Sequence, residues 1–197
     1  HTDAVQSFCK EKIDVFTMKV DMLSASGHKI GASKGVGFLY VGERVKIEPI
    51  IVGGNQENSL RAGTQNVPAI MGFAKAISIA EKVDKEKMIE LRDYFISKLE
   101  NIGGKINGSK EKRLCNNIDV SFSGADNDSM LIKLSENGIM CSTKSACASK
   151  QKKENRILSA LGLKKEEIGG ALRFSLNEFN TKKEIDIVVR ELEKIVP

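Results

Sequence analysis

The sequence predicts an α/β fold in which a compact α+β unit follows the first part of the chain. Three observations predict it. Short apolar runs alternate with Gly and Ser in residues 1–50, helical periodicity begins at Pro68, and strand and helix patterns alternate after residue 117. The 197 residues are 41% hydrophobic, which is enough for a folded core and excludes a disordered tail.

In residues 1–50, apolar runs predict short strands at 15–16, 20–23 and 36–41, and another short strand ends at Asp3. The segment 53–66 (GGNQENSLRAGTQN) is too polar for a core and predicts a loop. From Pro68 to Leu99, apolar residues recur with helical spacing, so we expect one long helix that ends before Gly103. A domain boundary along this helix divides the chain into residues 1–75 and 76–197.

The second half predicts a strand at 117–122, a helix at 126–137 ended by Gly138, and a short strand at 139–141. A serine-rich loop, STKSACASK, follows at 142–150. A short helix at 154–161, a strand at 171–176 and an amphipathic helix at 182–196 complete the chain.

Charge and cysteine content narrow the function classes. The formal net charge is +5, and the basic excess lies between Lys144 and Lys165, where seven Lys or Arg accompany a single acidic residue, Glu154. The four cysteines form no C-x-x-C pair, which leaves a zinc ribbon without support, and we expect no metal site. No signal-like or long apolar segment is present, so we expect a cytoplasmic protein with free thiols and no membrane contact.

The aromatic content argues against direct nucleic-acid binding, because the chain has no Trp and only two Tyr that could stack on bases.

Four patterns point to chemistry, and each has a structural alternative. In SASGHKIGASKG, Lys29 follows a predicted strand, where desolvation would make it a Schiff-base amine, although an isolated loop lysine is usually a solvated surface residue. Ser26 and the backbone N–H groups around Gly27 suit a phosphate. Asp3, in HTDAVQ, can keep a cofactor ring nitrogen protonated or can simply cap a helix.

The other two patterns lie in the second half. Cys147 lies between small residues in a lysine-rich loop that favours the thiolate, whereas the alternative is a buried structural thiol. Arg173 is the only basic residue of ALRFSL and needs an anion, either an amino-acid carboxylate or an internal salt bridge.

The motifs HTDAVQ, SGHKIGASKG, GGNQE, RAGTQN, STKSACAS and LRFSLNEFNTKKEID occur in an order and spacing that resembles the cysteine desulfurases, which belong to the class V aminotransferase group. The resemblance covers nearly the whole chain but only about the C-terminal half of a family member. It implies the C-terminal part of a pyridoxal phosphate-dependent transferase of fold type I. Residues 1–75 would then belong to the large cofactor-binding domain, and residues 76–197 would form the small domain with the catalytic cysteine loop.

The resemblance also implies roles for individual residues. Lys29 would bind pyridoxal 5'-phosphate covalently, Asp3 would pair with its ring nitrogen and Gln6 with its ring hydroxyl. Ser26, Gly27 and His28 would contact the phosphate, with His28 also near the chemistry, and Thr64 would reach the phosphate of the neighbouring subunit of a homodimer. Arg173 would bind the carboxylate of L-cysteine, and Cys147 would be the nucleophile.

The implied activity removes sulfur from L-cysteine, giving L-alanine and a persulfide on Cys147. The sulfur would pass to an iron–sulfur scaffold or a tRNA-thiolation protein. Two alternatives remain open: a selenocysteine lyase or another class V enzyme, and a non-catalytic domain that binds an acidic partner through the basic stretch. Because the other half of the enzyme would complete the cofactor pocket, we expect this chain alone to have little or no activity.

Overall fold

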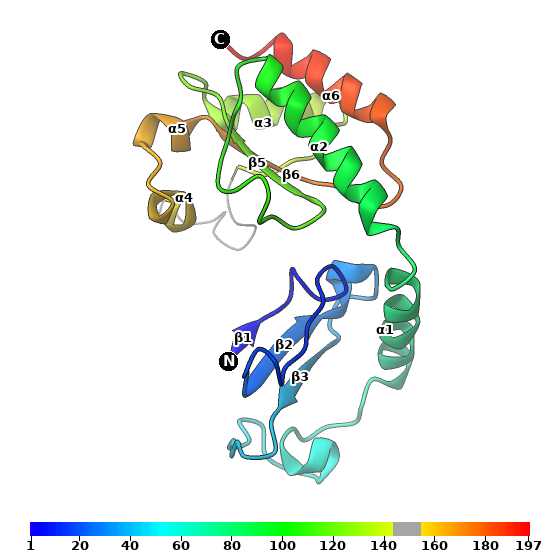
Figure 1. The fold of residues 1–197 in the computed structure, drawn as a ribbon. Helices are drawn as coiled ribbons and strands as arrows, with labels where there is room; N and C mark the ends of the chain where they lie inside the picture. The colour runs from blue at the N-terminus through cyan, green and yellow to red at the C-terminus, as the bar shows by residue number, and fades with distance from the viewer. Residues whose placement is uncertain (144–154) are drawn as a thin grey trace. The chain divides into compact units, whose positions relative to one another are not determined.

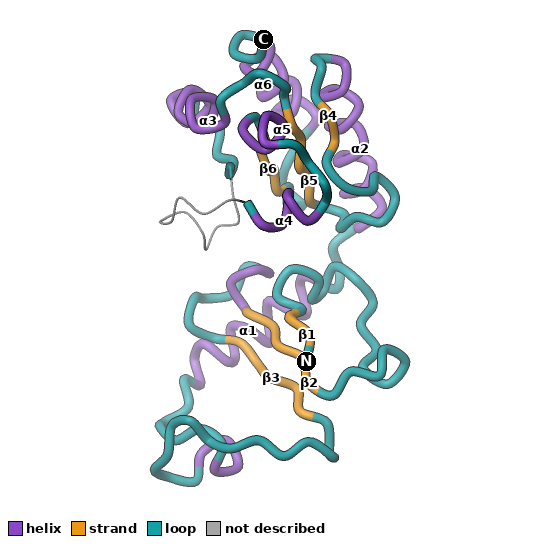
Figure 2. The backbone as a smooth tube through the Cα atoms, turned by 90° about the vertical axis from the view of Figure 1, so that its left-hand side faces the viewer, coloured by secondary structure: helices purple, strands orange, loops and turns teal. Residues whose placement is uncertain are grey.

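The computed structural model describes residues 1–143 and 155–197, which form two compact units, His1–Val83 and Asp84–Pro197 (Figure 1). Each unit contains a three-stranded sheet of its own, drawn as orange strands in Figure 2. The assignment of residues 1–75 and 76–197 to two domains of a longer enzyme stays a prediction.

The first unit is built on a sheet with the strand order β1-β2-β3. Strand β1 pairs with β2 in parallel, and β2 pairs with β3 in antiparallel orientation. Its elements are β1 (Thr2–Asp3), β2 (Met22–Ser26), the 3-10 helix η1 (Gly27–Ile30), β3 (Gly37–Val41), the 3-10 helix η2 (Gln56–Ser59) and α1 (Val67–Ala80).

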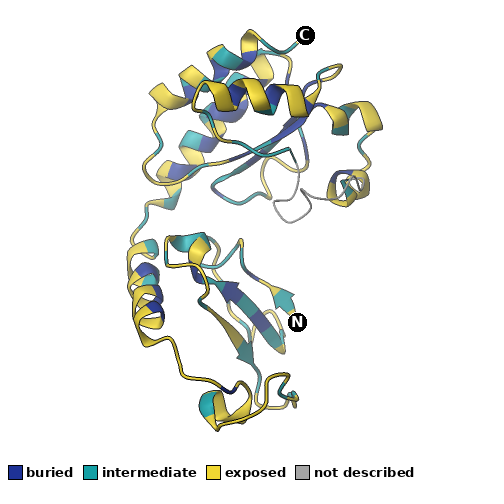
Figure 3. Cartoon of the chain, turned by 180° about the vertical axis from the view of Figure 1, so that it is seen from behind, coloured by how far each residue is buried: buried dark blue, intermediate teal, exposed yellow. Residues whose placement is uncertain are grey.

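Helix α1 packs on this sheet through one face. Its buried residues Ala69, Phe73 and Ala76 recur at helical spacing. The ring of Phe73 lies 6.2 Å from that of Phe8 and 6.1 Å from that of Phe38 between centroids. In Figure 3 the buried residues of α1 lie toward the strands, while the rest of the helix is exposed. This aromatic cluster holds η1 and the end of β2 against α1.

The second unit is built on an antiparallel sheet with the strand order β4-β5-β6. Helix α6 contacts α2 and α3. Helix α2 contacts β4 and β5, α3 contacts β6, and α5 contacts β5 (Figures 1 and 2). The elements are α2 (Lys85–Asn101), β4 (Lys105–Ile106), β5 (Asn117–Ser121), α3 (Asn127–Glu136), α4 (Arg156–Ala160), α5 (Lys165–Gly169), β6 (Ala171–Ser175) and α6 (Lys182–Glu193).

The core of the second unit lies on one face of its sheet. Alternate residues of β5 and β6 point into it, including Ile118, Val120 and Leu172, which are fully buried. The rings of Phe95 and Phe174 meet edge-on with centroids 5.1 Å apart. Each such side chain contributes roughly 1.5–3 kcal/mol by burial. The opposite face of the sheet carries polar residues and is described below.

The predicted continuous helix between Pro68 and Leu99 is wrong. Helix α1 ends at Ala80, and Asp84 begins α2 by accepting a hydrogen bond of 3.0 Å from the N–H of Lys87. The apolar spacing continues across this break because both helices bury one face.

Two predicted strands are also wrong. Residues 15–16 lie in a turn, because the carboxylate of Asp14 accepts hydrogen bonds from the N–H groups of Phe16 and Thr17, and Phe16 is 84% exposed. Residues 139–141 form no strand, and the extended pairing there is one bridge between Ser142 and Arg173.

The remaining predicted elements are confirmed to within a few residues. β3, β5 and β6 lie within the predicted ranges 36–41, 117–122 and 171–176, and α3 and α6 lie within 126–137 and 182–196. Gly138 follows α3 with a φ of +74°, as expected for its predicted role at the helix end.

Candidate functional site

The first group of candidate residues gathers where β1 and β2 end. These strands are parallel, with Thr2 opposite Leu23 and Asp3 opposite Ser24, and the N–H of Ala4 donates to Ser24 O at 2.8 Å. Because parallel strands point their carboxyl ends to the same edge, Asp3 and the residues after β2 emerge together. The sequence positions that were predicted to bind a cofactor therefore share one edge of this sheet.

Four candidates occupy consecutive positions, from Ser26 at the end of β2 to Lys29 on η1. Ser26 Oγ lies 2.7 Å from His28 Nδ1, and Lys29 is half-buried on η1. The N–H of Gly27 donates to Val36 O at 2.9 Å, which ties the turn to the segment before β3. The hydroxyl of Ser26, the imidazole of His28 and the amine of Lys29 therefore all extend from one short stretch of backbone.

Gly27 fits the turn because it has no side chain. A Cβ there would lie 3.0 Å from Cβ of Ala32, 3.0 Å from Cγ1 of Val36 and 3.2 Å from Cδ2 of Phe73. The turn thus packs directly against α1. Gly31 then ends η1 with a φ of +86°, which an L side chain rarely adopts.

Asp3 and Gln6 lie beside this turn. One oxygen of the Asp3 carboxylate accepts the N–H of Val5 at 2.9 Å, and the side chain is exposed. Gln6 is exposed in the turn that follows. Asp3 therefore has a fixed orientation and an accessible oxygen that can pair with a cationic ring nitrogen.

These residues fit pyridoxal phosphate in their chemistry. The cofactor needs an amine for its aldehyde, an anion for its ring nitrogen and donors for its phosphate. Lys29, Asp3 and the Ser26–His28 pair supply these groups. The individual roles stay predictions.

Two candidates lie elsewhere. Thr64 is exposed in the segment before α1, and among the described residues no hydrogen bond joins it to the turn of Lys29. Cys147 and the adjacent lysine-rich loop lie outside the described residues.

Arg173 lies on the polar face of the second unit's sheet. It lines a pocket of about 250 Å³ together with residues from β5, the loop before it and the region of α4. The other lining residues are Asn107, Arg113, Asn117, Asp119, Asn155, Ile157, Leu158 and Leu161. Within the described ranges, the Arg173 guanidinium forms no ion pair within 4 Å, so it is available to an anion.

The pocket contains charges that sequence reasoning missed. Burial raises the pKa of the Asp119 carboxyl, an effect that is opposed by a hydrogen bond from Asn107 and by the charges of Arg113 and Arg173. Burial lowers the pKa of the Arg113 guanidinium, and Arg92 adds to this effect while Asp119 opposes it. The one available signal was the alternation in NIDVSF, which puts Asp119 on the face opposite Ile118 and Val120.

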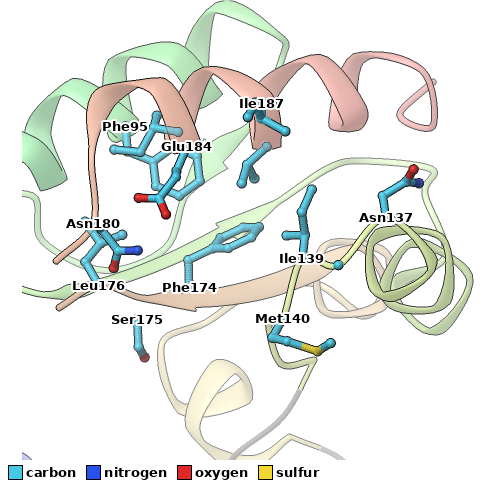
Figure 4. Close-up of a pocket in the computed structure, with 13 residues that line it drawn as sticks. Phe95, Asn137, Ile139, Met140, Phe174, Ser175, Leu176, Asn180, Glu184 and Ile187 are labelled. Atoms are coloured by element: carbon cyan, nitrogen blue, oxygen red, sulfur yellow. The ribbon is translucent and has the colours of Figure 1, made fainter.

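A second pocket of about 300 Å³ lies between α6, β6 and residues 137–140 (Figure 4). Its walls include the apolar side chains of Phe95, Ile139 and Phe174. Among the described residues that line it, the one acid is Glu184, which is already bound to Thr181 in the cap of α6. This part of the chain therefore contributes no free acid to the pocket.

Residues 1–143 and 155–197 contain no group of three or more His, Cys, Asp or Glu side chains placed to hold a metal ion. No helix among them is both long enough and apolar enough to cross a membrane.

Comparisons with a family model and with known proteins indicate the same family. The family model described as aminotransferase class-V matches residues 1–188. The chain is 42% identical to "Cysteine desulfurase IscS" of Dictyoglomus turgidum over 201 residues and 41% identical to that of Methanosarcina thermophila over 200 residues. Both alignments cover 100% of this chain, and they cover 51% and 50% of the relatives.

Solved structures agree with this grouping. A structure titled "NIFS-LIKE PROTEIN" superposes with a TM-score of 0.87 at 36% identity, covering 98% of this chain and 50% of that one. A NifS-like protein from Rickettsia africae gives a TM-score of 0.88 at 29% identity, with 98% and 52% coverage. The mixed α/β fold is thus that of half of a fold type I enzyme, and the chain spans about half the length of the curated relatives it matches.

Proposed function

Because the chain belongs to the class V aminotransferase family, we propose that it is part of a pyridoxal phosphate-dependent cysteine desulfurase. The observation that carries the proposal is the grouping of Lys29, Ser26 and His28 on one turn beside Asp3, at the carboxyl edge of two parallel strands. The identity of about 40% with several proteins named cysteine desulfurase supports the same activity.

The side chains of the first unit hold and orient the cofactor. Lys29 binds it covalently and, once released, moves a proton at the substrate. Asp3 keeps the ring nitrogen protonated, Gln6 binds the ring hydroxyl, and the Ser26–His28 pair binds the phosphate. When bound, pyridoxal phosphate supplies an electron sink that makes bonds at the substrate carbons labile.

Arg173 and Cys147 act on the amino acid itself. Arg173 binds the carboxylate of L-cysteine through its guanidinium. The Cys147 thiolate attacks the substrate sulfur, so that a sulfur–sulfur bond forms and the carbon–sulfur bond breaks. The carbon takes up a proton, and the products are L-alanine and a persulfide on Cys147.

The sulfur then passes to an acceptor protein. The basic residues between Lys144 and Lys165 favour an acidic surface on that partner, and they also stabilise the thiolate of Cys147. The acceptor class is an iron–sulfur scaffold or a tRNA-thiolation protein. A homodimer fits the predicted role of Thr64, which contacts the phosphate held by the neighbouring subunit.

The proposal has a direct test in the protein that contains this chain. Lys29→Ala removes the visible absorbance of the bound cofactor and L-alanine formation, whereas Lys34→Ala, an exposed lysine in the same loop, preserves both. Cys147→Ser abolishes persulfide and L-alanine formation and keeps the absorbance. Full activity on L-cysteine in Cys147→Ser would exclude the persulfide route and favour another class V activity.

The chain by itself should lack most of this activity, because it spans about half the length of the relatives. The measurement is its absorbance spectrum with pyridoxal phosphate and its release of sulfide from L-cysteine. A normal spectrum with turnover would overturn the expectation that the cofactor pocket is incomplete.

A further inference from the structure

Gln56 is joined to the residue that precedes Thr64. Its side-chain oxygen accepts the N–H of Gly63 at 3.1 Å, across the loop that leads into α1. Because the Gly63 N–H is a donor, only the oxygen of the Gln56 amide can face it. Gln56 is half-buried, whereas its neighbours on both sides are exposed. The side chain therefore lies against the loop rather than in solvent, and it holds the backbone directly before Thr64.

Gly54 leaves room for this contact. A Cβ at position 54 would lie 2.6 Å from Oε1 of Gln56 and 3.1 Å from its Nε2. Real Cβ atoms do not approach other heavy atoms as closely as 2.6 Å. Any larger residue at position 54 would therefore push the amide oxygen of Gln56 away from Gly63.

The turn after Gln56 has a conformation that its residues disfavour. Glu57, Asn58 and Ser59 have φ values of 50°, 56° and 64°, which lie in the left-handed region. Each L residue in this region costs free energy, because its Cβ approaches the following carbonyl oxygen. Such a turn persists only where its surroundings hold it. The bond between Gln56 and Gly63 closes the loop around this turn and is one contact that holds it.

The start of α1 limits the position of Thr64 from the other side. The side chain of Asn66 accepts the N–H of Ala69 at 3.2 Å, which fixes the residue at which the helix begins. The N–H of Val67 also donates to Gln65 O at 2.9 Å. Thr64 thus lies between two points at which a side chain holds the backbone, although Thr64 itself is exposed.

We propose that Gln56 is a positioning residue that orders the backbone at Gly63, so that the Thr64 hydroxyl is presented to the phosphate of pyridoxal phosphate in the neighbouring subunit. This rests on the proposed function, which gives Thr64 that contact. Fixing the backbone of an exposed residue before the ligand arrives removes part of the entropic cost of binding. Losing the bond to Gln56 therefore weakens phosphate binding, although Gln56 acts only through Thr64.

The first measurement uses the 197-residue chain. Hydrogen exchange followed by NMR reports how readily the bond to the Gly63 N–H opens. In Gln56→Met, whose side chain has a similar length and no amide oxygen, the Gly63 N–H should exchange about fivefold faster than in the unchanged chain. Gln56→Glu, whose carboxylate can accept the same N–H, should restore slow exchange. Equal exchange rates in all three chains would overturn the proposal.

The second measurement uses the protein that contains this chain. Its readout is the Kd of pyridoxal phosphate, compared with the Kd of pyridoxal, which lacks the phosphate, at a concentration where all variants have one oligomeric state. Thr64→Ala should weaken pyridoxal phosphate by about tenfold, and Gln56→Met by about fivefold. The double variant should be no weaker than Thr64→Ala, because Gln56 acts through Thr64. The affinity for pyridoxal should stay unchanged throughout, whereas general damage to the fold would weaken both ligands.

Asn58→Gly is the control, because it removes another amide side chain from the same turn at a φ that glycine readily adopts, and it should leave both affinities unchanged. Losses that add in the double variant, or an equal loss of pyridoxal affinity in Gln56→Met, would overturn the positioning role and leave the proposed function intact. An unchanged Kd for pyridoxal phosphate in Thr64→Ala would instead overturn the contact of Thr64 on which the inference rests.

Discussion

Replacing Gly27 with Ala measures how tightly the turn after β2 is held against α1. The added Cβ would lie 3.0 Å from side-chain carbons of Ala32 and Val36 and 3.2 Å from one of Phe73. Carbon atoms in ordinary contact are about 3.5–4.0 Å apart, so each neighbour has to move by several tenths of an ångström. Overpacking of this kind costs about 1–3 kcal/mol, and the same movement displaces the amine of Lys29.

Urea denaturation followed by tyrosine fluorescence gives the free energy of unfolding of the first unit. The chain has two tyrosines, Tyr40 in β3 and Tyr94 in α2, so a Tyr94→Phe background reports on Tyr40 alone. Gly72→Ala is the matched control, because a Cβ at this exposed position of α1 meets nothing within 4 Å and should stabilise the helix by about 0.5–1 kcal/mol. A midpoint for Gly27→Ala that is unchanged or raised would refute the close packing.

Three further predictions concern the second half. Thr181→Ala removes the cap of α6, in which Thr181 Oγ1 accepts the N–H of Glu184 at 3.3 Å, and should lower the free energy of unfolding by about 1 kcal/mol. Thr181→Ser should lower it little, and equal urea midpoints for the two variants would count against the cap. Burial raises the pKa of the Cys141 thiol to about 11 from an ordinary 9.0. Iodoacetamide at pH 7.5 should therefore label this thiol roughly 100-fold more slowly in the native chain than in urea, and fast labelling of the native chain would contradict this. Replacing Lys150, Lys152 and Lys153 of the basic stretch with Gln should slow sulfur transfer to an acceptor more than it slows L-alanine formation with a small reductant. Equal effects on both rates would indicate a plain solvated surface.

The elements that were predicted correctly from the sequence are those that depend on local patterns of residues. β5 follows from the alternation in NIDVSF, and α3 from apolar spacing between Asp126 and Gly138. Two of the wrong predictions arose where side-chain hydrogen bonds override apolar periodicity. Asp84 begins a new helix within a continuous apolar pattern, and Asp14 turns residues 15–16 away from a strand.

The candidate site could also be predicted from the sequence only in part. Ser26, His28 and Lys29 lie within one turn, so their proximity was evident from the sequence. The surroundings of Arg173 were not, because the contribution of Asp119 depends on the register between β5 and β6. Antiparallel register depends on cross-strand packing, which residue order alone does not specify.

The most direct test of the central claim is mass spectrometry of the protein that contains this chain, after reaction with L-cysteine without added reductant. We expect the peptide with Cys147 to gain the mass of one sulfur atom, in an amount matched by the L-alanine released, and we expect Lys29→Ala to lose both products. L-alanine formation that persists in Lys29→Ala, or that leaves Cys147 unmodified throughout, would contradict the account.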